Sequence, residues 1–370
     1  MLWQPCSHDI QHHLGESTVL LYATLMGRAY NHLGGATESL YTELLDLSLS
    51  SWSPPSVPRA TVVSKTVRTH RYLYLQRNLG GHRQQLFLGP DDEKTRGRVK
   101  HLRDEWEATS SDAQPKERLV AMLRAAGAQG PDSQTARVLQ ALSRHGVFRS
   151  GAVLIGTQAL VTMGSALGVS WARPWKTDDI DVASERLRIV FGGSCSVPDA
   201  LSDTGMAFHP IPGLDPRRAS TSYKLRGRSL RLDILTPLQG PESYQPVHLP
   251  NLNVSATPLR HLDYLIEDPM PAAQIARSGD LVIVPQPSRF GLHKLLVASR
   301  RPPAWANRAS KDRRQAEAML AFLADERPEG LRIAWQALGV HHSKAQERVM
   351  TEIQRIDSSV RELVLRVLGG

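Results

Sequence analysis

Apolar residues recur at two different spacings, and the change between them divides the chain. Spacings of three and four residues predict helices in the first part, over 16–33, 92–108, 116–127 and 132–146. The first of these helices is expected to stop at Gly34-Gly35. Alternation over 67–77 and 83–88, with glycines between the two runs, predicts a β-hairpin. Residues 1–148 are therefore expected to form an N-terminal helical region with one hairpin.

Short, continuous apolar runs mark the middle of the chain. The run Ala152–Ile155 ends at Gly156, which predicts a buried strand leading into a helix over 157–167. Three further strands are predicted, at Ile180–Ala183, Ser229–Leu235 and Leu281–Val284. Helical spacing then returns over 287–299, 308–324, 330–338 and 343–368. This order predicts an α/β (α+β) fold in which a small mixed sheet over 149–286 precedes a helical C-terminal domain over 287–370.

Composition narrows the class of protein. The formal net charge is +9, and 41% of the residues are hydrophobic, which suffices for a core. The nearest candidate for a membrane span, Val19–Met26, is too short, and no lysine or arginine precedes it as in a secretion signal. Two cysteines and the lack of a CxxC pair exclude a disulfide scaffold and a zinc knuckle. We expect a cytoplasmic protein that does not cross a membrane.

Two carboxylates share one face of a predicted strand. Residues two apart on a strand point to the same side, so Asp179 and Asp181 project together while Ile180 and Val182 are buried. Neighbouring carboxylates repel each other unless a cation lies between them, and Mg²⁺ prefers oxygen ligands. Asp233 lies on another predicted strand, between apolar neighbours. Taken alone, the first pair is more typical of a solvated edge strand, but the additional acidic strand favours a metal site.

Three segments follow one another in a distinctive order: Leu154-Ile155-Gly156-Thr157, Asp179-Ile180-Asp181-Val182 and Leu232-Asp233-Ile234. This order resembles that of the polymerase-β-type nucleotidyltransferase superfamily. The chain resembles, more narrowly, a largely uncharacterised bacterial family with this fold. That resemblance also rests on Gly156–Ala159, Thr177–Asp181, Leu232–Pro237, Val284–Phe290, His293–Leu296, Arg300-Arg301 and Lys311–Ala316. Two features depart from the superfamily pattern. Thr157 replaces the usual glycine or serine, and the long segment between Thr157 and Asp179 predicts an extra loop.

The resemblance implies a nucleotidyltransferase catalytic domain over 149–286 and assigns roles to its residues. Asp179, Asp181 and Asp233 would be catalytic and would bind two Mg²⁺ ions, with Mn²⁺ as an alternative metal. The amides of Gly156 and Thr157 at a helix N-terminus would bind the phosphates of a nucleoside triphosphate. Gly156 taken singly is equally compatible with an ordinary turn between a strand and a helix.

Cations from other segments would complete the phosphate site. They are Lys176, Lys294 and Arg300, while Arg301 and Lys311 would assist or bind the backbone of an acceptor. For Lys176, contact with the triphosphate and exposure to solvent are equally compatible with the sequence. Arg313 and Arg314 are expected on a solvated helix face.

These features predict an enzyme that transfers a nucleoside monophosphate from a nucleoside triphosphate to an acceptor. The basic charge favours an RNA end such as that of tRNA, and so do, by analogy, distant relatives that act as toxins in bacterial defence. A protein or a small molecule is an alternative acceptor. Most of the cations are arginine, a bias that a GC-rich genome also produces. The alternative function is a catalytically inactive nucleotide- or RNA-binding module, which the three aspartates argue against and which Thr157 favours.

Overall fold

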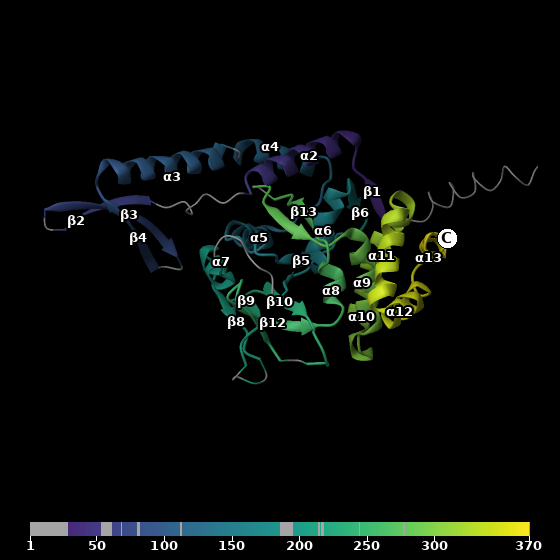
Figure 1. The fold of residues 1–370 in the computed structure, drawn as a ribbon. Coiled ribbons are helices and arrows are strands. Elements are labelled where there is room, and N and C mark those ends of the chain that lie inside the picture. Colours follow the sequence, from purple (N-terminus) through teal and green to yellow (C-terminus); the bar gives the residue numbers. More distant parts are fainter. Residues whose placement is uncertain are drawn as a thin grey trace, which may run out of the picture.

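A mixed sheet forms the centre of the molecule (Figure 1). The computed structural model describes residues 29–52, 61–67, 69–79, 82–111, 113–185, 195–213, 215, 218–243, 245–276 and 278–369. The strands of the central sheet follow the order β11 (Val247–Leu249), β12 (Val254–Leu259), β10 (Arg231–Pro237), β7 (Asp179–Ala183) and β5 (Val153–Ile155). Strands β7, β10 and β12 run parallel, whereas β5 and β11 are antiparallel to their neighbours. The predicted strands at 152–155, 180–183 and 229–235 are thus confirmed.

Two further strands branch from β10, and helices cover the sheet. Strand β9 (Ser222–Leu225) pairs with the start of β10, and β8 (Phe208–Pro210) pairs with β9. The fourth predicted strand, β14 (Leu281–Val284), pairs instead with β13 (Met270–Ala273) in a separate two-stranded sheet. The helices of this part are α5 (Ser133–Arg144), α6 (Gly156–Ala166), α7 (Val197–Asp203) and α8 (Leu262–Ile266). The mixed α+β class predicted from the sequence is confirmed.

The C-terminal helices gather beside the central sheet (Figure 1). They are α9 (Pro287–Ser299), η1 (Pro303–Trp305), α10 (Ala306–Glu326), α11 (Pro328–His341), α12 (Ser343–Ile353) and α13 (Ser358–Gly369). The prediction of one helix over 343–368 is wrong, because the chain turns between α12 and α13. The carboxylate of Asp357 accepts hydrogen bonds from the backbone amide and the hydroxyl of Ser359, which caps a new helix there.

The start of the described chain differs from its prediction. Of the helix predicted over 16–33, residues 16–28 lie outside the described residues, and Tyr30–His32 form strand β1. This strand pairs with β6 (Val169–Trp171), and the pairing satisfies the backbone hydrogen-bonding groups of β1. Strand β6 occupies part of the long segment between Thr157 and Asp179. Gly34-Gly35 do not end a helix. Gly34 has extended ψ and precedes α2 (Gly35–Ser50).

A three-stranded sheet and one helix form an arm, defined here as residues 61–111, which projects from the rest of the molecule (Figure 1). Its elements are β2 (Thr61–Val67), β3 (His70–Leu79), β4 (His82–Pro90) and α3 (Glu93–Ser111). The predicted hairpin is confirmed in β3 and β4, although its turn at Gly80-Gly81 lies outside the described residues. The chain then returns through α4 (Ala113–Ala125) to α5.

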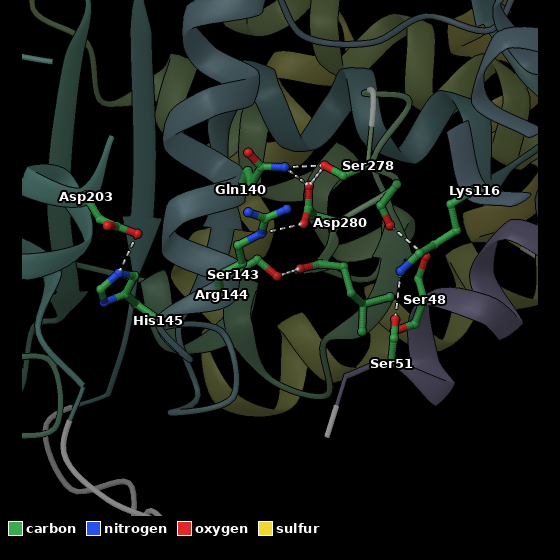
Figure 2. A network of polar contacts seen from close by, with 12 residues as sticks. Ser48, Ser51, Lys116, Gln140, Ser143, Arg144, His145, Asp203, Ser278 and Asp280 are labelled. Carbon is green, nitrogen blue, oxygen red and sulfur yellow. Dashed lines mark hydrogen bonds and ion pairs between the residues drawn. The ribbon is translucent and has the colours of Figure 1, made fainter. Parts of the chain in front are cut away.

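Polar contacts join α2 and α5 to the start of β14 and the turn before it, and they join α4 to α2 (Figure 2). The Ser48 hydroxyl donates to the Gly279 carbonyl oxygen over 2.6 Å, and the Ser143 hydroxyl donates to the Leu281 carbonyl oxygen over 2.7 Å. Lys116 Nζ donates to the Ser51 hydroxyl over 2.8 Å, which joins α4 to the end of α2. Within the described residues, no helix combines the length and the apolar character needed to cross a membrane. The domain boundaries at 148 and 286 stay predictions.

Candidate functional site

Three aspartates meet at the centre of the sheet because β7 and β10 are parallel neighbours. Their register places Asp181 opposite Asp233 and Asp179 opposite Arg231. Asp179 and Asp181 lie two residues apart and share one face, while Ile180 on the other face is fully buried. Asp179 is exposed, whereas Asp181 and Asp233 are partly buried. The structure therefore brings together the three carboxylate-bearing positions that the sequence predicts.

Gly156 lies against the middle of this cluster. Its φ is +70°, and a Cβ added there would lie 2.2 Å from Asp181 Oδ2. The turn therefore requires glycine twice, once for the backbone conformation and once for the space that the carboxylate fills. Gly156 is also the first residue of α6, so the unpaired amides of that helix begin beside Asp181.

Thr157 is buried, and its hydroxyl belongs to a contact between two helices. Gln315 Nε2 on α10 donates to Thr157 Oγ1 over 3.0 Å, and both side chains are almost inaccessible to solvent. The side-chain amide oxygen of Gln315, Oε1, has no hydrogen-bond partner among the described residues. The replacement of a small residue by threonine is thus accommodated by α10. Gln315 lies within the segment Lys311–Ala316, but nothing in the sequence pattern gives it a role.

The Asp181 carboxyl carries the clearest electrostatic perturbation of the cluster. Burial is the largest cause, and together with the charges of Asp233 and Asp179 it raises the pKa of Asp181 to about 6. Lys294 and Arg231 oppose this rise because a nearby cation stabilises the ionised carboxylate. The raised pKa of Asp181 thus reflects its burial first and the repulsion from the neighbouring carboxylates second.

Asp233 is held by two residues that sequence reasoning missed. Arg231 Nε donates to Asp233 Oδ1 over 2.6 Å, and the hydroxyl of Ser222 donates to the same oxygen. Arg231 could have been found, because it lies two residues before Asp233 and must share its face. Ser222 could not, since the short strand β9 was not predicted.

Helices α9 and α10 present cations to the carboxylates. Lys294 Nζ lies 3.0 Å from Asp312 Oδ1, and Arg301 lies 3.1 Å from Asp312 Oδ2, so one buried aspartate links the two helices. Lys311, next to Asp312, is partly buried. Burial and the charge of Lys294 lower the pKa of Lys311, while Asp179, Asp312 and Asp181 raise it. The structure thus places Lys294 and Lys311 within electrostatic reach of the aspartates.

Other predicted cations lie elsewhere. Arg300, at the end of α9, forms an ion pair with Glu242 over 3.2 Å. Lys176 is exposed in the loop before β7. The expectation that Arg313 lies on a solvated face is wrong, because its guanidinium pairs with the buried Glu352 of α12 over 2.6 Å. Arg314 is exposed, as expected.

The donor set suits a hard divalent cation. Asp179, Asp181 and Asp233 offer only carboxylate oxygens, the ligands that Mg²⁺ prefers, and their mutual repulsion would be relieved by a cation. Over the residues that the structure describes, no three His, Cys, Asp or Glu side chains are arranged as a ready-made metal site. One oxygen of Asp233 is occupied by Arg231 and Ser222.

Comparison with known proteins identifies the family. A family model described as nucleotidyltransferase matches residues 133–339, which is more than half of the chain and runs from α5 into α11. The matched region contains the three aspartates, Gly156, Lys294 and Lys311. Searches of curated proteins and of solved structures found no match. The chain therefore belongs to the nucleotidyltransferase family, whose general activity is nucleotidyl transfer.

Proposed function

We propose that the protein transfers a nucleoside monophosphate from a nucleoside triphosphate to an acceptor, in a reaction that depends on Mg²⁺. One observation carries this proposal: Asp181 and Asp233 face each other across parallel strands, beside Asp179 and directly in front of Gly156 at the start of α6. A carboxylate cluster beside a helix N-terminus combines a site for cations with a site for phosphate oxygens.

The aspartates are the residues that would hold the metal, as two Mg²⁺ ions or with Mn²⁺ as a substitute. When bound, Mg²⁺ would neutralise charge on the phosphates and make an acceptor hydroxyl a better nucleophile. Asp179 is exposed and open to a metal ion, whereas Arg231 and Ser222 must both withdraw from Oδ1 of Asp233 before both oxygens of that carboxylate are free.

The protein groups around the aspartates would bind and orient the triphosphate. The first amides of α6, at Gly156 and Thr157, would donate to phosphate oxygens. Lys311 would add positive charge near Asp179 and Asp181, and Lys294 would do so from the same face of the helical part. These groups favour an in-line attack at the α-phosphorus because they hold the leaving phosphates in place.

An RNA end, such as that of tRNA, is the acceptor that the charge of the chain favours. The net charge of +9 attracts a polyanion and would speed its encounter with the site. Modification of a cellular RNA in the cytoplasm would also suit a toxin-like role. A protein hydroxyl and a small molecule are the other acceptors that the experiment below separates.

A labelling experiment tests the reaction. The protein is incubated with each α-labelled nucleoside triphosphate, Mg²⁺ or Mn²⁺, total RNA and cell extract, and the labelled fraction is identified. Label in RNA is expected, and it should be lost in Asp179→Ala/Asp181→Ala. Asp178→Ala is the matched control, because Asp178 is an exposed carboxylate next to the cluster and is given no role in the reaction. The absence of label with every nucleotide and both metals would reject the transferase in favour of a binding module.

A further inference from the structure

A groove lined by arginines lies on the other side of the central sheet from the aspartates. Its volume is about 930 Å³, and its charged lining consists of Arg124, Arg137, Arg144, Arg226, Arg228 and Glu117. Leu225 also lines the groove. On β9, Leu225 lies three residues after Ser222, and side chains an odd number of positions apart on a strand point to opposite faces. Because Ser222 faces Asp233, Leu225 points to the other face of the sheet.

The two walls of the groove come from different elements. Arg137 and Arg144 lie seven residues apart on α5 and therefore share one helix face, together with Gln140. Arg226 and Arg228 belong to the turn between β9 and β10, across the groove. A ligand in the groove would thus have guanidinium groups on both sides.

Most of this positive charge is not neutralised by the protein. All five arginines are exposed. Within the described chain, Arg137, Arg226 and Arg228 have no ion pair, and Arg124 donates to the Ile275 carbonyl oxygen, which is not charged. Arg144 makes a long ion pair, 3.8 Å, with Asp280 (Figure 2). That carboxylate also accepts from Gln140 and Ser278, so it only partly compensates Arg144.

We propose that this groove binds the sugar–phosphate backbone of a single RNA strand. Guanidinium groups donate paired hydrogen bonds that match phosphate oxygens, and arginines on both walls suit a chain that carries one charge per nucleotide. Gln134, Gln140 and Ser133 add uncharged hydrogen-bonding groups for sugar and phosphate. A concave groove does not fit the surface of a membrane, which is broad and nearly flat. Contacts to phosphate and sugar are the same for every nucleotide, so binding in this groove should not depend on the base sequence.

The groove rests on the proposed function in one respect, because it would hold the acceptor. Arg228 precedes Asp233 by five residues, a path of at most about 17 Å along the chain. An RNA strand that leaves the groove over the β9–β10 turn therefore reaches the end of the sheet at which Asp179 and Asp233 lie. This places the bound part of the RNA close to its reacting end.

Binding of a fluorescent uridine RNA of about 20 nucleotides, longer than most single-strand footprints, tests the groove. Fluorescence anisotropy is measured for the full chain from about 50 to 200 mM salt, without nucleotide. The variant Arg137→Ala/Arg226→Ala/Arg228→Ala should bind at least tenfold more weakly, and its dependence of log Kd on log salt should fall by about 2, because each lost phosphate contact removes about 0.7. The matched control, Lys344→Ala/Arg348→Ala/Arg366→Ala, removes three exposed cations of α12 and α13 and should change Kd less than twofold.

Further arms make the outcome decisive. Arg137→Lys/Arg226→Lys/Arg228→Lys keeps the charge and should retain most of the binding, which would attribute the loss in the alanine variant to the removed charges. Equal weakening by the groove variant and the α12–α13 control, or equal competition by polyglutamate and by unlabelled RNA, overturns the proposal. Asp179→Ala/Asp181→Ala should bind RNA as tightly as the parent. If the groove binds RNA but the protein labels nothing, the transferase is rejected and the groove is kept. If the groove variant labels RNA as well as the parent does, the groove is rejected and the transferase is kept.

Discussion

At Asp181, the ionised carboxylate that would bind a metal ion also lowers the stability of the folded protein. Burial, and then Asp233 and Asp179, raise its pKa to about 6, so the folded protein binds a proton at this carboxyl more tightly than the unfolded chain does. The contribution of this group to stability is therefore full below about pH 4 and is lost as the pH rises through about 6. At neutral pH the loss is on the order of 3 kcal/mol, from a shift of about two units.

Asp181→Asn removes this titration, and the variant should gain stability relative to the parent as the pH rises. The difference in the free energy of unfolding, measured by urea denaturation, should shift by up to about 3 kcal/mol in favour of the variant between pH 4 and pH 7.5. Asp178→Asn, in which an exposed neighbour changes, should show no such trend. A parent–variant difference that is the same at both pH values would contradict the electrostatic account of the cluster.

Gly156 makes a second prediction at the scale of one residue. Gly156→Ala adds a Cβ that would lie 2.2 Å from Asp181 Oδ2, on a backbone with φ of +70°. Gly205→Ala is the matched control, since Gly205 has φ of +67° but open space around it. Both variants should lose about 1 kcal/mol to backbone strain, and Gly156→Ala should lose a further 1–3 kcal/mol by displacing the carboxylate. Urea denaturation measures both, and equal losses would show that Asp181 does not fill this space.

The sequence contains much of the site at this scale because strand alternation is a local rule. It placed Asp179 and Asp181 on one face, and the same rule applied to β10 would have added Arg231 beside Asp233. The contacts of longer side chains cannot be predicted from strand alternation. Arg300 follows the helix that carries Lys294, yet its guanidinium reaches Glu242 in a loop that no periodicity positions.

At the scale of elements, continuous apolar runs and long periodic segments were predictable, and short strands were not. Strand β5 is a continuous apolar run, and β7 and β10 alternate buried apolar residues with partly exposed polar ones. Strands β6, β9 and β13 have three or four residues each, too few for a pattern to stand out, and they exist because partners distant in sequence pair with them. Gly34-Gly35 shows the same limit, since one glycine pair can end a helix or precede one.

The link between α9 and α10 gives a prediction about two elements. Asp312 is 5% exposed and pairs with both Lys294 and Arg301. Asp312→Asn would leave two partly buried cations without their anion, so the free energy of unfolding should fall by about 2–4 kcal/mol. Glu329→Gln removes a carboxylate from an exposed pair with Arg332 on α11 and should cost less than about 1 kcal/mol. Urea denaturation at pH 7 measures the free energy of unfolding of both variants. A loss for Asp312→Asn no larger than that for Glu329→Gln would show that apolar contacts, and not this ion pair, hold the two helices together.

At the scale of the whole molecule, the apolar core crosses long distances in sequence. One cluster of buried residues contains Tyr30 near one end and Val367 near the other. Tyr30 also donates a hydrogen bond to Asp325 over 3.0 Å, and its strand pairs with β6. Patterns within a window of residues identify which side chains are buried, but they do not tell which of several buried surfaces meet. The sequence therefore predicted the elements of this core better than their association.

The arm is the exception, because it has a small core of its own. Leu73, Leu75 and Leu88 pack with Val99 and Leu102 of α3, in a cluster separate from the others. Apart from a contact between β3 and α7, and the passage of α3 into α4, the arm shares little with the rest of the described structure. Its removal should therefore leave the central sheet and the helices around it folded.

The variant that tests this replaces residues 53–112 by about six glycine and serine residues, which span about 13 Å on average. Such a linker suffices because Lys116 Nζ reaches the Ser51 hydroxyl over 2.8 Å (Figure 2), and these two residues are three and one positions from the cut ends Ala113 and Trp52. Near-ultraviolet circular dichroism follows the packed aromatic side chains, among them the buried Trp171, and it should show one cooperative thermal transition within about 5 °C of the parent, a shift that corresponds to about 3 kcal/mol for a chain of this size. Loss of that signal at room temperature would mean that the arm supports the core, and that α2 and α4 cannot pack on β13 without it.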